Sequence, residues 1–291
     1  SRFDTCCFLD NQQYESGTGS FECMAGVGEI ARLETASGIA FERLRQFSSV
    51  QKDWLFGHFS FDLKTETDAV PSRLPDHIGF PGLFFFVPKI IVLLNQYSLS
   101  IGMMDDHHER ILEEIRQAPP PSTAVQQLPL NVLPRIKKEE YLRIIEKLKS
   151  HIFRGDCYEI NFCQEFYAEE AVVHPPLLFQ SLNRVSPSPF SAYYTTGGKY
   201  LLCASPERFL KRKGDQILSQ PIKGTAARDP YNKKHDEELR KELMNSEKDR
   251  AENVMIVDLV RNDLSRICRA NSVKVEELFG IYCFPQVHQM I

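Results

Sequence analysis

The sequence predicts a globular chain that mixes β-strands and α-helices, and three observations support this. Of its 291 residues, 42% are hydrophobic and 25% are charged, which is average for globular proteins and excludes disordered, collagen-like and coiled-coil chains. The first half contains alternating and continuous apolar runs that are typical of strands. A helical periodicity follows a proline-rich stretch at residues 118–134, so helices contribute as well.

The first half is expected to be mostly β-structure. Residues 54–63 alternate and residues 84–94 are almost continuously apolar, so both predict strands, and residues 106–117 favour one helix. The proline-rich stretch can form neither a helix interior nor a central strand. The chain is therefore expected to have three parts: an amino-terminal region at 1–117, a linker at 118–134 and a second domain at 135–291.

After the linker, helices and strands follow in close order. Apolar residues at helical spacing predict an amphipathic helix that ends near Gly155: Tyr141, Ile144, Ile145, Leu148 and Ile152. Residues 157–167 alternate as a half-buried strand does. Glycines between 190–194 and 200–204 predict a hairpin, and residues 217–222 predict a further strand.

Charge and hydropathy exclude two classes of partner. The 35 Lys and Arg residues against 39 Asp and Glu give a net charge of −4, whereas a protein built around nucleic-acid phosphate carries a basic excess. The most apolar stretch, residues 81–94, is interrupted by Pro88 and Lys89 and is shorter than the ~20 residues of a membrane span. No signal peptide is recognisable, so we expect a cytoplasmic protein with neither nucleic-acid nor membrane partners.

The cysteines do not form a recognisable framework. None of the eight is in a C-x-x-C pair, which disfavours a structural zinc site, and there is no secretory context for disulfides. We expect small buried apolar residues in a reducing compartment. They stand at Cys6, Cys7, Cys23, Cys157, Cys163, Cys203, Cys268 and Cys283.

Lys223 is the most informative position for chemistry. It lies between Ile222 and Gly224 at a predicted strand end, where a small neighbour leaves room for a ligand. The string PIKGT lacks the glycine run that cradles phosphate, so a phosphate loop is not supported. Lys223 is either a surface lysine in a turn, or a nucleophile or point charge.

Glu252 is a candidate metal ligand. The chain is predicted to be helical from Asp236 onward, and Ser246 with Asp249 forms a capping signature ahead of the apolar run 254–260. Glu252 stands one turn before that run, where its carboxylate would meet the core. Mg²⁺ typically takes one or two carboxylates; the alternative is a solvated acidic face.

Glu207 and His288 complete the candidates. Glu207 follows Ser205 and Pro206 at a strand end, where functional residues collect, although a lone glutamate there can equally be polar surface. A lone histidine such as His288 is either a catalyst or a hydrogen-bonded structural residue.

Five blocks in this order resemble the chorismate-utilising enzymes: 155–166 (GDCYEINFCQEF), 205–210 (SPERFL), 221–228 (PIKGTAAR), 249–268 (DRAENVMIVDLVRNDLSRIC) and 287–291 (VHQMI). The first half is more loosely similar, through FLD at 8–10 and GHFSFDLK at 57–64. The resemblance implies an α+β fold like that of anthranilate synthase component I, in which large, mostly antiparallel sheets pack face to face with helices outside and the site between them.

Within that family, Lys223 indicates the branch. The aminodeoxychorismate branch, component I of para-aminobenzoate synthase, has lysine before the glycine of PIKGT, whereas the anthranilate branch typically has alanine. The resemblance implies that Lys223 adds to C2 of chorismate as the 4-hydroxyl leaves, and that ammonia then adds at C4 and expels the lysine. The product would be 4-amino-4-deoxychorismate, a precursor of para-aminobenzoate and folate.

The resemblance also implies roles for the other candidates. Glu207 is the acid/base, with His288 nearby; Thr225 and Gly224 contact the substrate; Glu252 is one of two glutamates that hold Mg²⁺. Because no amidotransferase nucleophile motif is present, ammonia would come from a partner glutamine amidotransferase. A lysine amine in water has a pKa of about 10.4 and is almost fully protonated near pH 7, so the site must be desolvated.

The chain ends inside the block that holds His288. We expect the second metal glutamate to lie downstream of Ile291, and the C-terminal part of the fold and of the catalyst to be missing. The alternatives are anthranilate synthase component I, disfavoured by Lys223, a water-using isochorismate or salicylate synthase, and a non-catalytic chorismate-binding subunit.

Overall fold

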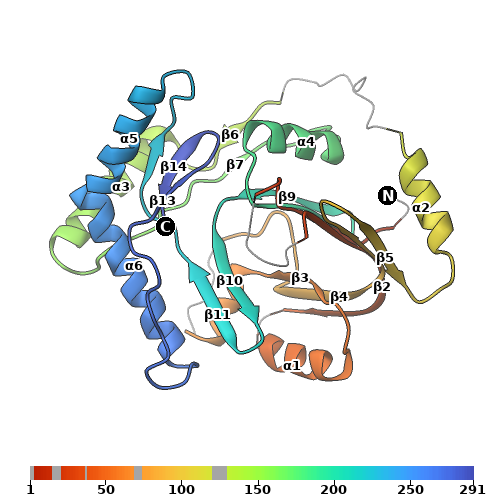
Figure 1. The fold of residues 1–291 in the computed structure, drawn as a ribbon. Coiled ribbons are helices and arrows are strands. Elements are labelled where there is room, and N and C mark those ends of the chain that lie inside the picture. The colour runs from red at the N-terminus through yellow and green to blue at the C-terminus, as the bar shows by residue number, and fades with distance from the viewer. Residues whose placement is uncertain (1–2, 15–20, 37, 69–73, 120–129) are drawn as a thin grey trace. The chain divides into compact units, whose positions relative to one another are not determined.

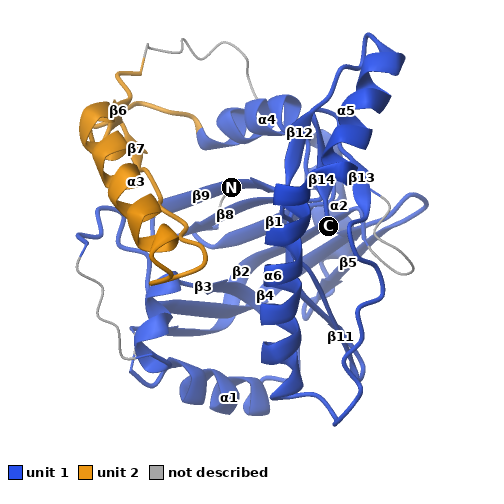
Figure 2. Ribbon diagram, turned by 90° about the vertical axis from the view of Figure 1, so that its left-hand side faces the viewer, with its two compact units in different colours: residues 1–119, 175–291 blue, residues 120–174 orange. Residues whose placement is uncertain are grey.

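The chain forms two compact units (Figures 1 and 2). The larger unit comprises residues 1–119 and 175–291, and the smaller unit comprises residues 120–174. The computed structural model describes these residues: 3–14, 21–36, 38–68, 74–119 and 130–291. Most of the expected linker at 118–134 therefore lies outside the described residues.

A seven-stranded antiparallel sheet organises the larger unit (Figure 1). Its order is β3–β4–β2–β1–β8–β9, and β5 also pairs with β4. The strands are β1 (Cys6–Asp10), β2 (Cys23–Thr35), β3 (Phe56–Phe59), β4 (Leu83–Leu94), β5 (Leu99–Met103), β8 (Phe190–Thr196) and β9 (Lys199–Ser205). β1 pairs with β8, from Cys6 opposite Thr195 to Asp10 opposite Ser191. Segments on both sides of the expected linker thus share one sheet.

The core lies against β4. Phe84 and Phe86 are at most 1% exposed and pack with Cys7 of β1, Phe56 of β3 and Tyr194 of β8. Burying each large apolar side chain stabilises the fold by about 1.5–3 kcal/mol. The strand predicted at 84–94 is confirmed, and its continuous apolar pattern reflects this burial.

β3 is shorter than the alternation at 54–63 predicts. Ser60 ends it by accepting a hydrogen bond from the Asp62 N–H, which starts the 3₁₀ helix η1 (Phe61–Glu66). Within β3, an added Cβ at Gly57 would lie 2.0 Å from the Phe84 carbonyl oxygen, so only glycine allows this approach to β4.

The predicted hairpin at 190–204 is confirmed. Gly197 and Gly198 link β8 to β9 with φ angles of 55° and 71°. Two consecutive positive φ angles define the two-residue turn whose twist suits a hairpin, and glycine adopts them without strain. This turn chemistry is local, so the sequence alone identifies it.

In its described residues, the larger unit also contains five α-helices and two smaller sheets. The helices are α1 (Ala40–Val50), α2 (His108–Gln117), α4 (Pro175–Val185), α5 (Lys233–Asn245) and α6 (Glu247–Ser265). One small sheet pairs β10 (Arg208–Lys213) with β11 (Gln216–Gln220), and the other has the order β12 (Thr225–Ala227), β14 (Val287–Met290), β13 (Ile281–Cys283). The predicted helix at 106–117 and strand at 217–222 are confirmed as α2 and β11, and the α+β class is confirmed.

The predicted helical region after Asp236 is two helices. They divide at Ser246, whose hydroxyl accepts a hydrogen bond from the Asp249 N–H and caps α6. The capping signature is therefore confirmed. No helix in the part of the chain that the structure describes is long and apolar enough to cross a membrane.

The smaller unit contains α3 (Lys138–Phe153) and a short sheet of β6 (Leu133–Pro134) and β7 (Phe166–Tyr167). The predicted amphipathic helix is confirmed as α3, and Gly155 ends it with a φ of 81°. The strand predicted at 157–167 is wrong except at β7. Instead, the side-chain amide of Gln164 accepts a hydrogen bond from the Ile136 N–H and donates one to the Ile136 carbonyl oxygen.

All eight cysteines are free thiols. The expectation that they are buried is wrong for Cys163 and Cys283, which are exposed, and it holds fully only for Cys7. Burial raises the pKa of the Cys7 thiol to about 12, so this cysteine is an inert core residue.

Candidate functional site

Main-chain hydrogen bonds fix Lys223 at the start of the small three-stranded sheet. Its N–H donates to the Met290 carbonyl oxygen at 3.0 Å, and the Met290 N–H donates to the Gly224 carbonyl oxygen at 3.1 Å. β12 then begins at Thr225, which lies opposite Gln289 of β14. Met290 is fully buried, so Lys223, itself half-buried, is attached to a rigid strand.

Gly224 brings the first turn of α6 against this segment. Its φ is +88°, and an added Cβ would lie 2.9 Å from the Cβ of Asp249. Both observations require glycine here, because an L side chain would be strained and would clash. The glycine predicted as a substrate contact therefore has a clear role in local packing.

Glu207 lies beside the Lys223 segment. It follows β9, and its Oε1 accepts a hydrogen bond from the Ile222 N–H at 3.1 Å. Its own N–H donates to the Ser205 hydroxyl oxygen at 3.2 Å. The exposed Glu207 carboxylate is therefore held next to the residue that precedes the lysine, although the two candidates are far apart in sequence.

Glu252 lies on α6, the helix that contacts Gly224. Its side chain is 34% exposed, and the Nζ of Lys248 lies 3.6 Å from its Oε1. No group of three or more His, Cys, Asp or Glu residues is arranged to hold a metal ion within the described ranges. Glu252 could supply one carboxylate to Mg²⁺, and water or substrate oxygens would have to supply the other ligands.

His288 is directed away from Thr225. It is 1% exposed, its Nε2 lies 3.1 Å from Asp236 Oδ1, and its Nδ1 lies 3.1 Å from Cys283 Sγ. Because side chains alternate along a strand, His288 lies on the face of β14 opposite to that of Gln289. The structure brings Glu207 to the Lys223 segment but directs the ring of His288 toward α5 and β13.

Gln289 is a candidate that sequence reasoning missed. It is 8% exposed and lies opposite Thr225 in the paired strands. Its Oε1 has no hydrogen-bond partner among the described residues, and the same is true of both polar atoms of the buried Asn253 on α6. A buried polar atom without a partner is unusual, so both side chains are candidate ligand contacts. Alternation along the strand VHQM separates Gln289 from the face of His288. Gln289 becomes a candidate only when β12 is known to pair with this strand.

An ion pair lies on the face of β14 that carries His288. Arg228 donates from Nε and Nη2 to the Asp236 carboxylate, with the Nη2–Oδ2 distance at 2.7 Å. Arg228 holds the pKa of Asp236 well below its ordinary value, and hydrogen bonds from the Asp229 N–H and His288 lower it further. Asp236 is therefore ionised at neutral pH and acts as a fixed acceptor.

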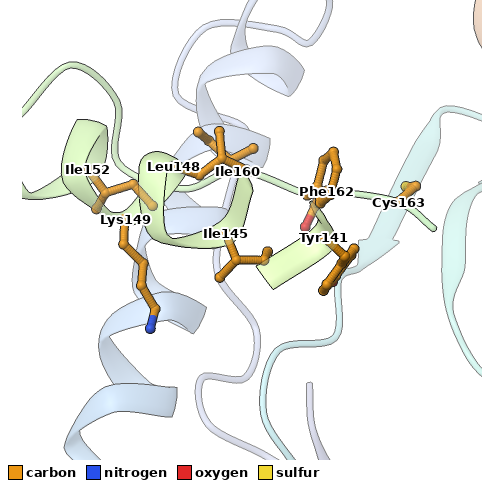
Figure 3. Close-up of a pocket in the computed structure, with 9 residues that line it drawn as sticks. Tyr141, Ile145, Leu148, Lys149, Ile152, Ile160, Phe162 and Cys163 are labelled. Carbon is orange, nitrogen blue, oxygen red and sulfur yellow. The ribbon is translucent and has the colours of Figure 1, made fainter. Parts of the chain in front are cut away.

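A separate apolar pocket of about 650 Å³ lies on the smaller unit (Figure 3). The apolar face of α3 lines one side, as its periodicity predicts, and the rings of Tyr141 and Phe162 lie 5.3 Å apart. Lys149 is the one ionisable amine among its lining residues. None of the predicted site residues lines this pocket.

A family model described as chorismate binding enzyme matches residues 5–291. The chain belongs to the chorismate-binding enzyme family. The aminodeoxychorismate synthase component 1 of Klebsiella aerogenes is 34% identical over 239 residues, which cover 81% of this chain and 52% of that protein. An anthranilate synthase component I-like protein of Synechocystis is 29% identical over 82% of this chain and 50% of that protein.

The fold agrees with this membership of the chorismate-binding enzyme family. The crystal structure of anthranilate synthase component I from Streptococcus pneumoniae TIGR4 superimposes with a TM-score of 0.75 at 22% identity, covering 95% of this chain and 70% of that one. The chain spans about half the length of the curated relatives it matches. The expected family and its fold are confirmed.

Proposed function

We propose that this chain carries the aminodeoxychorismate-forming site of the family, which converts chorismate and ammonia to 4-amino-4-deoxychorismate. The observation that carries the proposal is the position of Lys223, half-buried at a strand end, with the Glu207 carboxylate bound to the adjacent Ile222 N–H. A relative named aminodeoxychorismate synthase component 1 is 34% identical over 81% of this chain, which supports the same branch.

The proposed chemistry assigns one role to each of two side chains. The lone pair of the Lys223 Nζ forms a bond to C2 of the ring, both ring double bonds shift by one position away from C2, and the C4–oxygen bond breaks. Glu207, acting as the acid, donates a proton to the departing hydroxyl, which leaves as water. Ammonia then adds at C4, both double bonds shift back, and the C2–nitrogen bond to Lys223 breaks.

Other parts of the proposal rest on fewer contacts. Thr225 and Gln289, neighbours across β12 and β14, are proposed as polar contacts of the substrate. Glu252 is proposed as a ligand of Mg²⁺, which when bound would neutralise a chorismate carboxylate and draw electron density from the ring. His288 remains a predicted participant, and its contacts with Asp236 and Cys283 favour a positioning role.

Product analysis tests the branch. The full-length protein, with any residues beyond Ile291, is incubated with chorismate, ammonium salt and Mg²⁺, and the products are separated by chromatography. We expect 4-amino-4-deoxychorismate; anthranilate as the sole product would place the chain in the anthranilate synthase branch instead. Chorismate binding by calorimetry without turnover would favour a non-catalytic binding subunit.

Replacement of the nucleophile tests the mechanism. Lys223→Ala is expected to lower turnover by at least roughly 10³-fold, as loss of a covalent nucleophile does, whereas Lys213→Ala in exposed β10 is the matched control and should retain the parental rate. Without ammonia, the parental protein should accumulate a chorismate-derived adduct on the peptide that contains Lys223. Parental turnover by Lys223→Ala would remove this residue from the mechanism.

The source of ammonia forms a separate proposal. We infer that a glutamine amidotransferase subunit supplies ammonia to this protein in the cytoplasm. Glutamine alone should then fail to replace ammonium salt, and adding a matching amidotransferase subunit should restore product formation. Glutamine-dependent turnover by this chain alone would contradict the need for a partner.

A calorimetric measurement tests the proposed metal ligand without relying on activity. We expect the protein to bind Mg²⁺, and we expect Glu252→Gln to weaken that binding.

A further inference from the structure

Cys283, His288 and Asp236 form a continuous chain of contacts, and the proposed chorismate chemistry assigns no step to Cys283. The Sγ of Cys283 lies 3.1 Å from Nδ1 of His288, and Nε2 of His288 lies 3.1 Å from Oδ1 of Asp236. A nucleophile within hydrogen-bond reach of a base, with the base oriented by a third group, is the arrangement of activated nucleophiles.

The proton on His288 follows from its partners. Arg228 keeps Asp236 ionised, and an ionised carboxylate only accepts hydrogen bonds. Nε2 of His288 must therefore carry a hydrogen and donate it to Asp236. In the neutral ring, Nδ1 then has a free lone pair, which accepts the S–H of Cys283. The base is thus fixed in the tautomer that can take a proton from the thiol.

Burial separates the base from the nucleophile. His288 is 1% exposed, whereas Cys283 is an exposed thiol on the neighbouring strand, directly opposite His288 in the β13–β14 register. Cys283 is therefore open to solvent, and the base remains protected and oriented behind it. The cluster lies in one unit and joins α5, β13 and β14.

We propose that Cys283 is a site of reversible modification by low-molecular-weight disulfides, with His288 as its base. The Sγ attacks one sulfur of the disulfide, a new S–S bond forms, and the original S–S bond breaks. Nδ1 of His288 takes the thiol proton and returns it to the departing thiolate. The products are a mixed disulfide on Cys283 and one free thiol, and excess dithiol reverses the step.

The chain provides its own control in Cys163, which is also exposed but has no hydrogen bond to a histidine within the described ranges. The protein is treated with oxidised glutathione, and the mixed disulfides on both cysteines are followed by peptide mass spectrometry. We expect Cys283 to react roughly 10- to 100-fold faster than Cys163, as a positioned base allows. In concentrated guanidinium chloride the two rates should become similar, and dithiothreitol should remove both adducts.

Two variants separate base assistance from mere exposure. In His288→Gln and Asp236→Asn, the rate at Cys283 should fall to that of Cys163, while the rate at Cys163 and the circular dichroism spectrum stay unchanged. If His288→Gln does not fold, the test uses the parental protein alone. The ratio of the Cys283 rate to the Cys163 rate is then compared between the folded and the denatured protein. Equal rates at the two cysteines in the folded protein, or full reactivity of Cys283 in a folded His288→Gln variant, would overturn the proposal. Neither readout depends on chorismate turnover.

Discussion

The position of Lys223 depends most directly on the residue beside it. Gly224 adopts a φ of +88° and leaves no room for a Cβ against Asp249, so the first turn of α6 contacts the backbone next to the amine. The sequence alone shows the small neighbour but not what it approaches, because α6 begins more than twenty residues later.

Gly224→Ala should therefore be costly in two ways. The left-handed backbone costs about 1–2 kcal/mol for a residue with a Cβ, and the clash with Asp249 adds about 1–3 kcal/mol. Gly214→Ala is the matched control, since its φ is +60° but nothing lies within 4 Å of the added Cβ. Urea denaturation should show the larger loss for Gly224→Ala; equal losses would mean that the Asp249 contact is unimportant.

Asp236 gives the fold a defined response to acid. Its pKa is lower in the folded chain than its ordinary 3.8, chiefly through Arg228. The ionised Asp236 therefore stabilises the fold fully at pH values above its ordinary pKa. This stabilisation is lost as the pH falls through the lowered pKa of the folded chain. Asp236→Asn should lower the free energy of unfolding at pH 7, and the difference from the parental protein should shrink at pH 3.

Chemical denaturation at pH 7, 5 and 3 measures this difference. Asp258→Asn provides the comparison, because Asp258 pairs with Arg261 on exposed α6 and its side chain is 75% exposed. Such surface pairs contribute little, so this variant should resemble the parental protein throughout. A constant effect of Asp236→Asn at all three pH values would mean that its charge is not the stabilising feature.

Among the elements, β3 lies so close to β4 that a side chain at Gly57 would clash. Gly57→Ala would place a Cβ 2.0 Å from the Phe84 carbonyl oxygen and push β3 away from β4. We expect a loss of about 3 kcal/mol, the upper end for overpacking. Gly102→Ala in β5 is the control on the same edge of β4, because β2 pairs along the opposite edge and the added Cβ would lie 3.9 Å from Ile91. Thermal unfolding should separate the two variants, and similar midpoints would show that β3 can shift at little cost.

Elements with local causes could be predicted from the sequence. The periodicity of α3, the Ser246 cap of α6 and the Gly197–Gly198 turn are contained in short segments, and all three predictions are confirmed. A strand is different, because it needs a partner as well as alternation. Residues 157–165 alternate but instead bond through the Gln164 side chain, so the predicted strand does not form.

The candidate site shows the same limit. Lys223, Glu207 and Glu252 stand out only through a family resemblance, since each alone is an ordinary polar residue. One neighbour of His288 is distant in sequence, because Asp236 lies on α5, whereas Cys283 lies on the adjacent strand β13. No sequence pattern places these three side chains together, so both the orientation of His288 and the missed Gln289 required the strand pairing.

For the whole molecule, the shared sheet implies that the two parts of the chain stabilise each other. A fragment of residues 1–119 would lack β8 and β9, and Tyr194 would be missing from the core around Phe84. We expect this fragment to be largely unfolded alone and to fold when mixed with residues 130–291. Co-elution in gel filtration with a gain of circular dichroism would show this, whereas a cooperatively folded 1–119 fragment would contradict it.

The pairing of β1 with β8 also determines how long β1 lacks its partner strand during synthesis. Cys6 leaves the ribosome long before its partner Thr195. At ordinary translation rates the first strand waits roughly 10–40 s for the neighbour that covers its edge. During that interval the edge of β1 is available to any passing chain, so protection of this strand by a chaperone should matter.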